Sequence, residues 1–168
     1  PWQHIHAFPD GRAYPCCFAL DKYPVGDLNK DSMETVFNGK DMRQIRQNML
    51  SNKKSKHCTK CYDQEQSGFF SLRLSSNKHF GHNIGMVENT QEDGSADFVI
   101  KYWDIRFSNL CNLACRSCGT WFSSNWYEDH KKLTGAPPNH AKIMKVGRSS
   151  NDIWEQMLEQ FDHVEQFY

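Results

Sequence analysis

The residues best suited to chemistry in this chain are its cysteines, seven in 168 residues. Three of them, Cys111, Cys115 and Cys118, follow one another at a C-x3-C-x2-C spacing. Thiolates hold iron–sulfur clusters, and three on one short loop can reach three corners of a cubane and leave the fourth iron open. Zinc prefers a closed set of four ligands, which a triplet without a close fourth cysteine fits less well. The triplet therefore predicts a 4Fe–4S cluster with one free coordination position.

A second group of cysteines is spread over the first 61 residues. Cys16 and Cys17 are adjacent, and Cys58 and Cys61 form a C-x2-C pair. Adjacent cysteines rarely bind one metal together, so one of the first two is expected to be spare. C-x2-C is also half of a zinc site. The spacing predicts three ligands for a second metal centre, with the fourth ligand open and zinc as the alternative to iron.

The composition limits the compartment and the partners. The chain has 20 Lys and Arg against 20 Asp and Glu, and this balance argues against nucleic acid as the main partner. No run approaches the ~18 apolar residues that a membrane span needs. An odd number of cysteines without a secretory signal is poor evidence for a disulfide framework, so a cytoplasmic location is expected.

Local signals predict a small α+β module over residues 1–65. Pro9-Asp10-Gly11 is a turn signal between apolar segments, so a hairpin is expected within residues 1–18. Apolar residues at helical spacing predict one or two helices over residues 31–51, broken at Asn38-Gly39.

Residues 66–97 are expected to connect this module to the rest of the chain. A helix interrupted by Gly68 is predicted over residues 62–80. It leads into a linker with little periodicity and a turn at Asp93-Gly94.

Residues 98–168 alternate between predicted strands and helices. Phe98–Phe107 is rich in aromatic and β-branched residues and predicts a strand that leads directly into the cysteine triplet. Helices are expected over residues 121–133 and from Asn151 onward, separated by a loop, and a strand is expected over residues 164–168. This order predicts βα units of a parallel sheet.

Two further expectations concern this second part. Trp121, Phe122 and Trp126 stand at helical spacing and are expected to lie in the core. A parallel sheet needs both faces covered, which so short a unit cannot achieve alone, so the chain is expected to be a fragment of a larger α/β protein.

The triplet and its preceding strand resemble the signature of the radical S-adenosylmethionine (SAM) superfamily. The resemblance implies that residues 98–168 begin an incomplete (β/α) TIM-type barrel. It implies that Cys111, Cys115 and Cys118 bind a 4Fe–4S cluster whose open iron chelates SAM, and that cleavage of SAM gives a 5′-deoxyadenosyl radical. Ser117 stands where the family usually has an aromatic residue beside the adenine, and it is the expected cofactor-binding residue.

Residues 1–65 resemble the twitch domain, a shortened SPASM domain that accompanies many of these enzymes. Its pattern includes a cysteine five residues after a glycine, as Cys16 follows Gly11, and a closing C-x2-C. The resemblance implies an auxiliary 4Fe–4S cluster on Cys16, Cys58 and Cys61, with Cys17 as the alternative to Cys16 and with a further cysteine upstream of residue 1. A twitch domain ahead of the barrel is found in some phage and marine bacterial relatives.

These resemblances imply a radical SAM enzyme that abstracts hydrogen from an unknown substrate, a peptide being one candidate class, and that takes electrons from a reductant such as flavodoxin or ferredoxin. The alternative is a non-catalytic cytosolic zinc module with two thiol sites. Several other polar residues near these sites are minor candidates for ligand or cofactor contacts: His4, His6, His57, Arg106 and Asn109.

Overall fold

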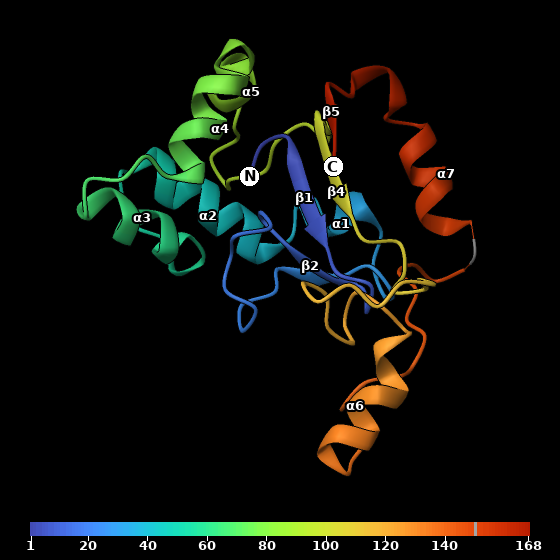
Figure 1. The fold of residues 1–168 in the computed structure, drawn as a ribbon. Coiled ribbons are helices and arrows are strands. Elements are labelled where there is room, and N and C mark those ends of the chain that lie inside the picture. Colours follow the sequence, from blue (N-terminus) through green and yellow to red (C-terminus); the bar gives the residue numbers. More distant parts are fainter. Residues whose placement is uncertain (150) are drawn as a thin grey trace.

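The computed structural model describes residues 1–149 and 151–168. A mixed five-stranded sheet with the order β3-β2-β1-β4-β5 lies at its centre (Figure 1). The strands are β1 (His4–Ala7), β2 (Arg12–Tyr14), β3 (Gly26–Asp27), β4 (Tyr102–Ile105) and β5 (Gln166–Phe167).

The predicted hairpin is present as β1 and β2, which pair antiparallel with His6 opposite Tyr14. Gly11 closes the turn with a φ of 92°, a left-handed conformation that glycine adopts without steric cost. On its other side β1 pairs parallel with β4, so that His4 lies opposite Tyr102. Strands from the first and the last predicted parts of the chain thus share one sheet. The domain boundaries expected from the sequence stay a prediction.

Helices surround this sheet. They are α1 (Met33–Phe37), α2 (Lys40–Leu50), α3 (Thr59–Gln66), α4 (Leu72–Phe80), α5 (Gly85–Glu88), α6 (Trp126–Thr134) and α7 (Asp152–Leu158), with short 3-10 turns η1 (Lys56–Cys58), η2 (Gly81–Asn83) and η3 (Phe161–His163). The Ser32 side chain accepts a hydrogen bond from Thr35 N and starts α1. The predicted break at Asn38-Gly39 separates α1 from α2, as expected.

The two faces of the sheet differ in polarity. One face carries Ile5, Ala7, Trp103 and Ile105, which pack with buried residues of α1, α2 and α7 into the hydrophobic core. Because successive strand residues point to opposite faces, the other face carries His4, His6, Tyr102 and Asp104. Helix α4 reaches this polar face, where Phe80 stacks on Tyr102 with ring centroids 5.9 Å apart.

The end of the chain forms the predicted βα unit. Strand β5 pairs parallel with β4, and α7 lies between them in sequence and packs on the core. Strand β4 spans four residues and is shorter than the predicted Phe98–Phe107. The predicted loop before α7 is present over its described residues, although its last residue, 150, lies outside them. The mixed α/β class is therefore confirmed, whereas a barrel stays a prediction.

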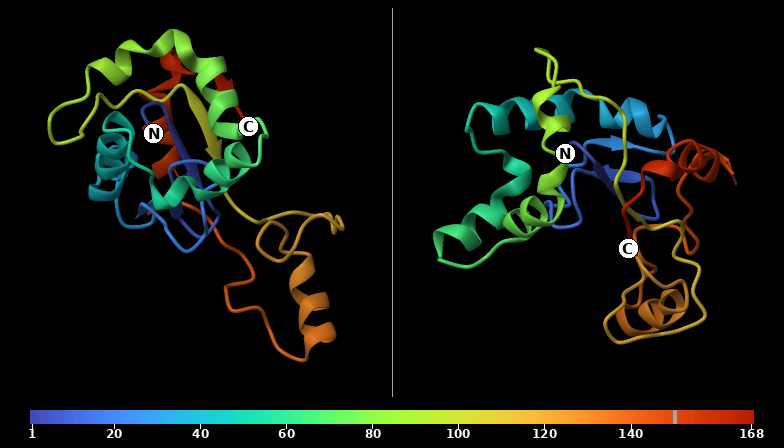
Figure 2. Two further views of the ribbon diagram at one scale, coloured as in Figure 1. Left: turned by 90° about the vertical axis from the view of Figure 1, so that its left-hand side faces the viewer. Right: turned by 90° about the horizontal axis from the view of Figure 1, so that it is seen from above.

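Helix α6 departs from the expectations. It begins at Trp126 rather than at residue 121, and it buries none of its residues. The expected core placement of Trp121, Phe122 and Trp126 is wrong, since Phe122 is exposed and the other two are only partly buried. Figure 2 shows the reason, because α6 and its flanking loops project away from the sheet.

Two boundaries in the connecting segment also differ from the prediction. The helix expected over residues 62–80 is two helices, α3 and α4, separated near Gly68, which has a φ of 82°. The short helix α5 falls in the segment expected to be a linker. No helix among the described residues combines the length and apolar character needed to cross a bilayer.

Candidate metal centre

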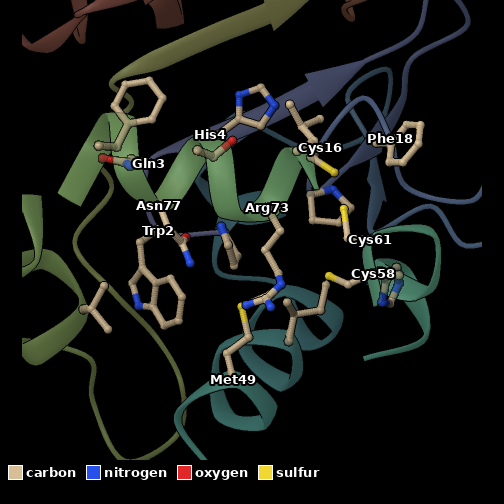
Figure 3. Close-up of a pocket in the computed structure, with 18 of the residues that line it drawn as sticks. Trp2, Gln3, His4, Cys16, Phe18, Met49, Cys58, Cys61, Arg73 and Asn77 are labelled. Carbon is tan, nitrogen blue, oxygen red and sulfur yellow. The ribbon is translucent and has the colours of Figure 1, made fainter. Parts of the chain in front are cut away.

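Cysteines from two distant parts of the sequence, Cys16 and the pair Cys58 and Cys61, line one cavity of about 800 Å³. Figure 3 shows their sulfur atoms gathered on one side of this cavity. Cys16 lies in the turn that follows β2, Cys58 ends η1, and Cys61 lies in the first turn of α3. The fold thus brings the C-x2-C pair to the same cavity as the hairpin cysteines, one of which the spacing predicted as the third ligand.

Local structure explains how Cys58 and Cys61 come to face the same way. The Ser55 hydroxyl accepts a hydrogen bond from His57 N at 3.4 Å and starts η1, and Cys58 N donates to Ser55 O at 3.0 Å. Turn η1 runs directly into α3. Residues three apart on a helical path lie on one face, so both thiols point to the cavity.

The three thiols influence one another electrostatically. Burial raises the pKa of Cys16 above its usual value, and proximity to Cys58 and Cys61 adds to this effect. Burial also raises the pKa of Cys58, and the neighbouring Cys61 thiol acts in the same direction. Metal ligation requires thiolates. The positive charge of a bound metal therefore has to offset the cost of ionising these buried thiols.

Cys17 has different surroundings. It reaches the edge of the same cavity but is exposed, and its thiol interacts with the Asp104 carboxylate on the polar face of the sheet. Burial, followed by the charges of Cys16 and Asp104, raises its pKa to about 11. These surroundings favour Cys16 as the ligand, and the choice between the two cysteines stays a prediction.

Comparison with protein families addresses the same segment. Residues 1–62 match the model of SPASM, an iron–sulfur cluster-binding domain. The match includes Cys16, Cys17, Cys58 and Cys61, the cysteines that line the cavity. No curated protein and no solved structure matches the chain. Iron–sulfur cluster binding is therefore supported for the SPASM segment, residues 1–62, and for that part of the chain alone.

The donors of the SPASM segment fit a cluster in their chemistry. Among residues 1–149 and 151–168, no three His, Cys, Asp or Glu side chains are grouped tightly enough to hold a single metal ion. In a cubane each thiolate binds a different iron, so its sulfur ligands stand farther apart than the ligands of one ion. Three thiols that lie on one side of a cavity, without being grouped tightly enough for a single ion, are consistent with the larger group.

The charged residues at the cavity are mainly basic. Lys53, Lys54 and Arg73 line it, and the one acidic residue in the lining, Glu65, forms an ion pair with Arg73. Proximity to Arg73 lowers the pKa of Cys58, although burial is the larger and opposite influence. Cations near the thiols favour their ionised form and would offset the negative charge of a thiolate-bound cluster.

The second cysteine group lies on the loop that follows β4. Cys115 is exposed, and Cys111 and Cys118 are half-buried. Backbone carbonyls of this loop accept hydrogen bonds from the segment that leads into α6 and from its first residue: Ser123 Oγ donates to Leu113 O at 2.5 Å, and Trp126 Nε1 donates to Cys115 O at 3.0 Å. Helix α6 and the residues before it thus have a role that the sequence did not indicate, because Ser123 and Trp126 hold the cysteine loop.

Asn109 anchors the other side of this loop. Its side chain is fully buried, donates to Thr120 O and Lys142 O, and accepts from Met144 N at 2.8 Å. Its carbonyl accepts from Ser124 N at 2.8 Å. The sequence placed Asn109 near the site, and the structure gives it a positioning role through the backbone.

Ser117, the expected cofactor-binding residue, is exposed on the loop between Cys115 and Cys118. Its contact with an adenine stays a prediction. The three cysteines of this loop lie outside the SPASM match, so their role as cluster ligands is also a prediction.

Sequence reasoning missed a buried pair on the polar face of the sheet. His6 and Asp104 lie opposite each other on β1 and β4, and both are almost completely buried. Burial alone would raise the pKa of Asp104, but the proximity of His6 and Arg106 outweighs it and lowers this pKa. The available signal was the alternation of His4 and His6 with the apolar residues of β1.

Proposed function

We propose that this chain is part of a radical SAM enzyme, with an auxiliary 4Fe–4S cluster in the SPASM segment and a SAM-binding 4Fe–4S cluster on the loop after β4. The observation that carries the proposal is the convergence of Cys16, Cys58 and Cys61 on one cavity, within the residues that match an iron–sulfur domain. Residues 42 positions apart in the sequence, as Cys16 and Cys58 are, have no local reason to meet.

In the auxiliary site, the chain's own residues would supply thiolates and exclude water. Cys61 is buried and Cys16 and Cys58 are half-buried, so a cluster there would be largely shielded from solvent. Shielding and nearby charge are two of the properties that set the reduction potential of a cluster. The basic residues Lys53, Lys54 and Arg73 would favour its reduced, more negative state.

The second site is more open, as a cofactor-binding cluster requires. Cys111, Cys115 and Cys118 would hold three irons, and Ser117 would lie beside the cofactor. When bound, the cluster and SAM would supply the 5′-deoxyadenosyl radical that takes a hydrogen atom from the substrate. The protein's part is to hold the loop through Asn109, Ser123 and Trp126.

The position of this loop supports the proposal. It leaves the carboxyl end of β4, a strand that pairs parallel with β5 through a βα unit. Functional sites of α/β proteins collect at the carboxyl ends of their strands. We infer that β4 and β5 begin an incomplete (β/α) barrel in a cytoplasmic enzyme that takes electrons from a flavodoxin or ferredoxin and acts on an unidentified substrate, with a peptide as one class.

Anaerobic reconstitution with iron and sulfide tests the proposal. The chain is expected to bind iron and acid-labile sulfide in equal amounts. Replacing Cys16, Cys58 and Cys61 by Ala, or Cys111, Cys115 and Cys118 by Ala, should each remove about half of both. With a chemical reductant, the full chain in its native protein should release 5′-deoxyadenosine from SAM only while the second triplet is intact. Binding of zinc without sulfide would support the zinc module instead.

A further inference from the structure

The Cys58 thiol has a hydrogen-bond partner that is not itself a candidate ligand. This partner is the hydroxyl of Tyr62, which lies four residues further along the chain, in α3. Residues four apart on a helical path are neighbours on one face, so the spacing brings the two side chains together. Both residues line the cavity of the SPASM segment. The hydroxyl therefore lies beside one of the thiols that would hold the auxiliary cluster.

The hydroxyl of Tyr62 is the donor in this hydrogen bond. Ser55 N donates to Tyr62 Oη at 3.4 Å, which uses an oxygen lone pair and leaves the hydroxyl proton for another acceptor. Burial is the largest influence on both side chains and raises both pKa values. The hydrogen bond between them opposes this effect at Cys58 and adds to it at Tyr62. These opposite directions are those of a hydroxyl that donates to a thiolate.

Two cations contact the ring of Tyr62. Arg73 Cζ lies 5.4 Å and Lys54 Nζ lies 5.5 Å from the ring centroid, which is within the range of cation–π contacts. Arg73 is itself fixed by its ion pair with Glu65. These contacts hold the ring in place, so the hydroxyl stays directed at Cys58 without a rearrangement when charge develops there.

Cys16 has a hydrogen bond of a different kind. Its sulfur interacts with the backbone of Phe18, and this contact lowers the pKa of Cys16, although burial is the larger and opposite influence. A backbone N–H remains in place when the side chain of Phe18 is changed. Tyr62, by contrast, supplies a side-chain donor, which a single substitution removes while the ring stays.

A donor at a ligand sulfur changes the electron affinity of a cluster. Hydrogen bonds to the sulfurs are among the properties that set the reduction potential of an iron–sulfur cluster. Reduction adds one negative charge, and hydrogen bonds to ionised acceptors are stronger than those to neutral ones. The hydroxyl of Tyr62 would therefore stabilise the reduced state more than the oxidised state and raise the midpoint potential.

We propose that Tyr62 is a positioning residue of the auxiliary cluster, whose hydroxyl donates a hydrogen bond to the Cys58 sulfur and makes the cluster easier to reduce. This inference rests on the proposed auxiliary cluster. Tyr62 binds no iron in this assignment and acts through Cys58 alone. Its effect is directional and depends on one hydroxyl, unlike the general effect of the positive charges that line the cavity.

The test uses a chain in which Ala replaces the three cysteines of the loop after β4, so that the auxiliary cluster alone remains after anaerobic reconstitution. Tyr62→Phe keeps the ring and should leave the iron and acid-labile sulfide contents unchanged. Its midpoint potential should fall, by about 59 mV if the equilibrium constant for one-electron reduction falls tenfold. Tyr14→Phe is the matched control, because Tyr14 Oη donates to Asp21 O at 2.8 Å, and it should leave the potential unchanged.

A second measurement follows the hydroxyl proton itself. The reduced cluster is prepared in D₂O, and pulsed ENDOR measures the coupling of exchanged deuterons to its unpaired electron. Tyr62→Phe should lose one deuteron coupling that the parent and Tyr14→Phe retain. Equal potentials or equal couplings in the parent and Tyr62→Phe would overturn the proposal, and a Tyr62→Phe chain that no longer holds iron and sulfide would make Tyr62 a structural residue instead. If the parent binds no iron and sulfide at all, the proposed auxiliary cluster itself is wrong.

Discussion

The Nδ1 atom of His6 lies 2.9 Å from Oδ2 of Asp104, and this pair joins the SPASM segment to the strand that leads into the second cysteine loop. The two atoms are at ion-pair distance without the alignment of a hydrogen bond. Asp104 also lies 3.3 Å from Arg106 Nε. The two candidate sites therefore have a fixed relative position, because the parallel pairing of β1 with β4 and this buried pair hold both parts of the chain in one sheet.

Replacing Asp104 by Asn should reduce stability in a pH-dependent way. Asp104 has a lowered pKa in the folded chain, so it stabilises the fold above its unfolded pKa of about 3.9, and this contribution is lost as the pH falls through the folded pKa. At pH 7 we expect Asp104→Asn to lower the free energy of unfolding by roughly 1–3 kcal/mol. Urea unfolding between pH 3 and 7 should show the difference from wild type shrinking below about pH 4.

The matched control is Asp129→Asn, since Asp129 is half-exposed on α6 and forms an ion pair with Lys132. Exposed pairs contribute about 0–1 kcal/mol, so this variant should unfold nearly as wild type does at every pH. A loss in Asp104→Asn that stays constant from pH 7 to pH 3 would mean that the charge of Asp104 is not what stabilises the sheet.

The adjacent cysteines should behave differently on substitution. Cys16→Ala is expected to abolish the auxiliary cluster because it removes a cavity thiol, whereas Cys17→Ala should leave iron and sulfide contents unchanged. Iron and acid-labile sulfide analysis of the two reconstituted variants makes the comparison. The reverse result would show that Cys17, despite its position beside Asp104, is the ligand.

The loop after β4 should depend on its buried anchor. Asn109→Ala removes three side-chain hydrogen bonds and leaves two carbonyls and one backbone N–H unpaired. We expect a loss of about 1–3 kcal/mol for the buried Met144 N–H left unpaired, together with reduced iron loading of the second site alone. Thermal unfolding and iron analysis measure the two effects.

Asn125→Ala provides the comparison for that loop. Asn125 also bonds to the loop, donating to Asn112 O at 3.0 Å, but this contact is exposed and water can replace it. Its loss should change both measurements little. Equal iron loading in the Asn109 and Asn125 variants would show that burial of the anchor does not position the cysteines.

The parts of the fold that the sequence predicted correctly have local causes. The turn at Pro9-Asp10-Gly11 needs the left-handed φ of Gly11, and the break between α1 and α2 falls at Asn38-Gly39. Such signals act within a few residues and can be read from them. The C-x2-C pair is local in the same sense, because η1 and α3 place Cys58 and Cys61 on one face.

The parallel pairing of β1 with β4 is the feature that local signals could not give. It joins residues about 98 positions apart, and strand patterns carry no record of their partner. The contacts of His4 with Tyr102 O and of His6 with the Asp104 carboxylate depend on that pairing, because both partners lie on the distant strand. Likewise, the apolar spacing of Phe122 and Trp126 predicted burial, although α6 projects from the body and holds the cysteine loop instead.

Arg46 should tolerate no substitution by lysine, even though the charge is kept. It is fully buried, and its guanidinium donates to Pro1 O, Asn38 Oδ1, Gly94 O and Phe37 O. Burial lowers its pKa to about 10, so it stays charged at pH 7. A lysine ammonium cannot reach four acceptors in different directions from one point. We expect Arg46→Lys to cost about 2–6 kcal/mol, since at least two buried acceptors lose a donor at about 1–3 kcal/mol each.

Arg43→Lys on the same helix is the control for this change. Arg43 is partly exposed and pairs with Asp93 at 2.6 Å, so its replacement should cost about 0–1 kcal/mol. Thermal unfolding of both variants shows whether stability depends on the directional hydrogen bonds of the Arg46 guanidinium or on its positive charge alone. If the two melt at the same temperature, the positive charge alone holds the turn at Gly94 against α2, and the directional hydrogen bonds of Arg46 add nothing.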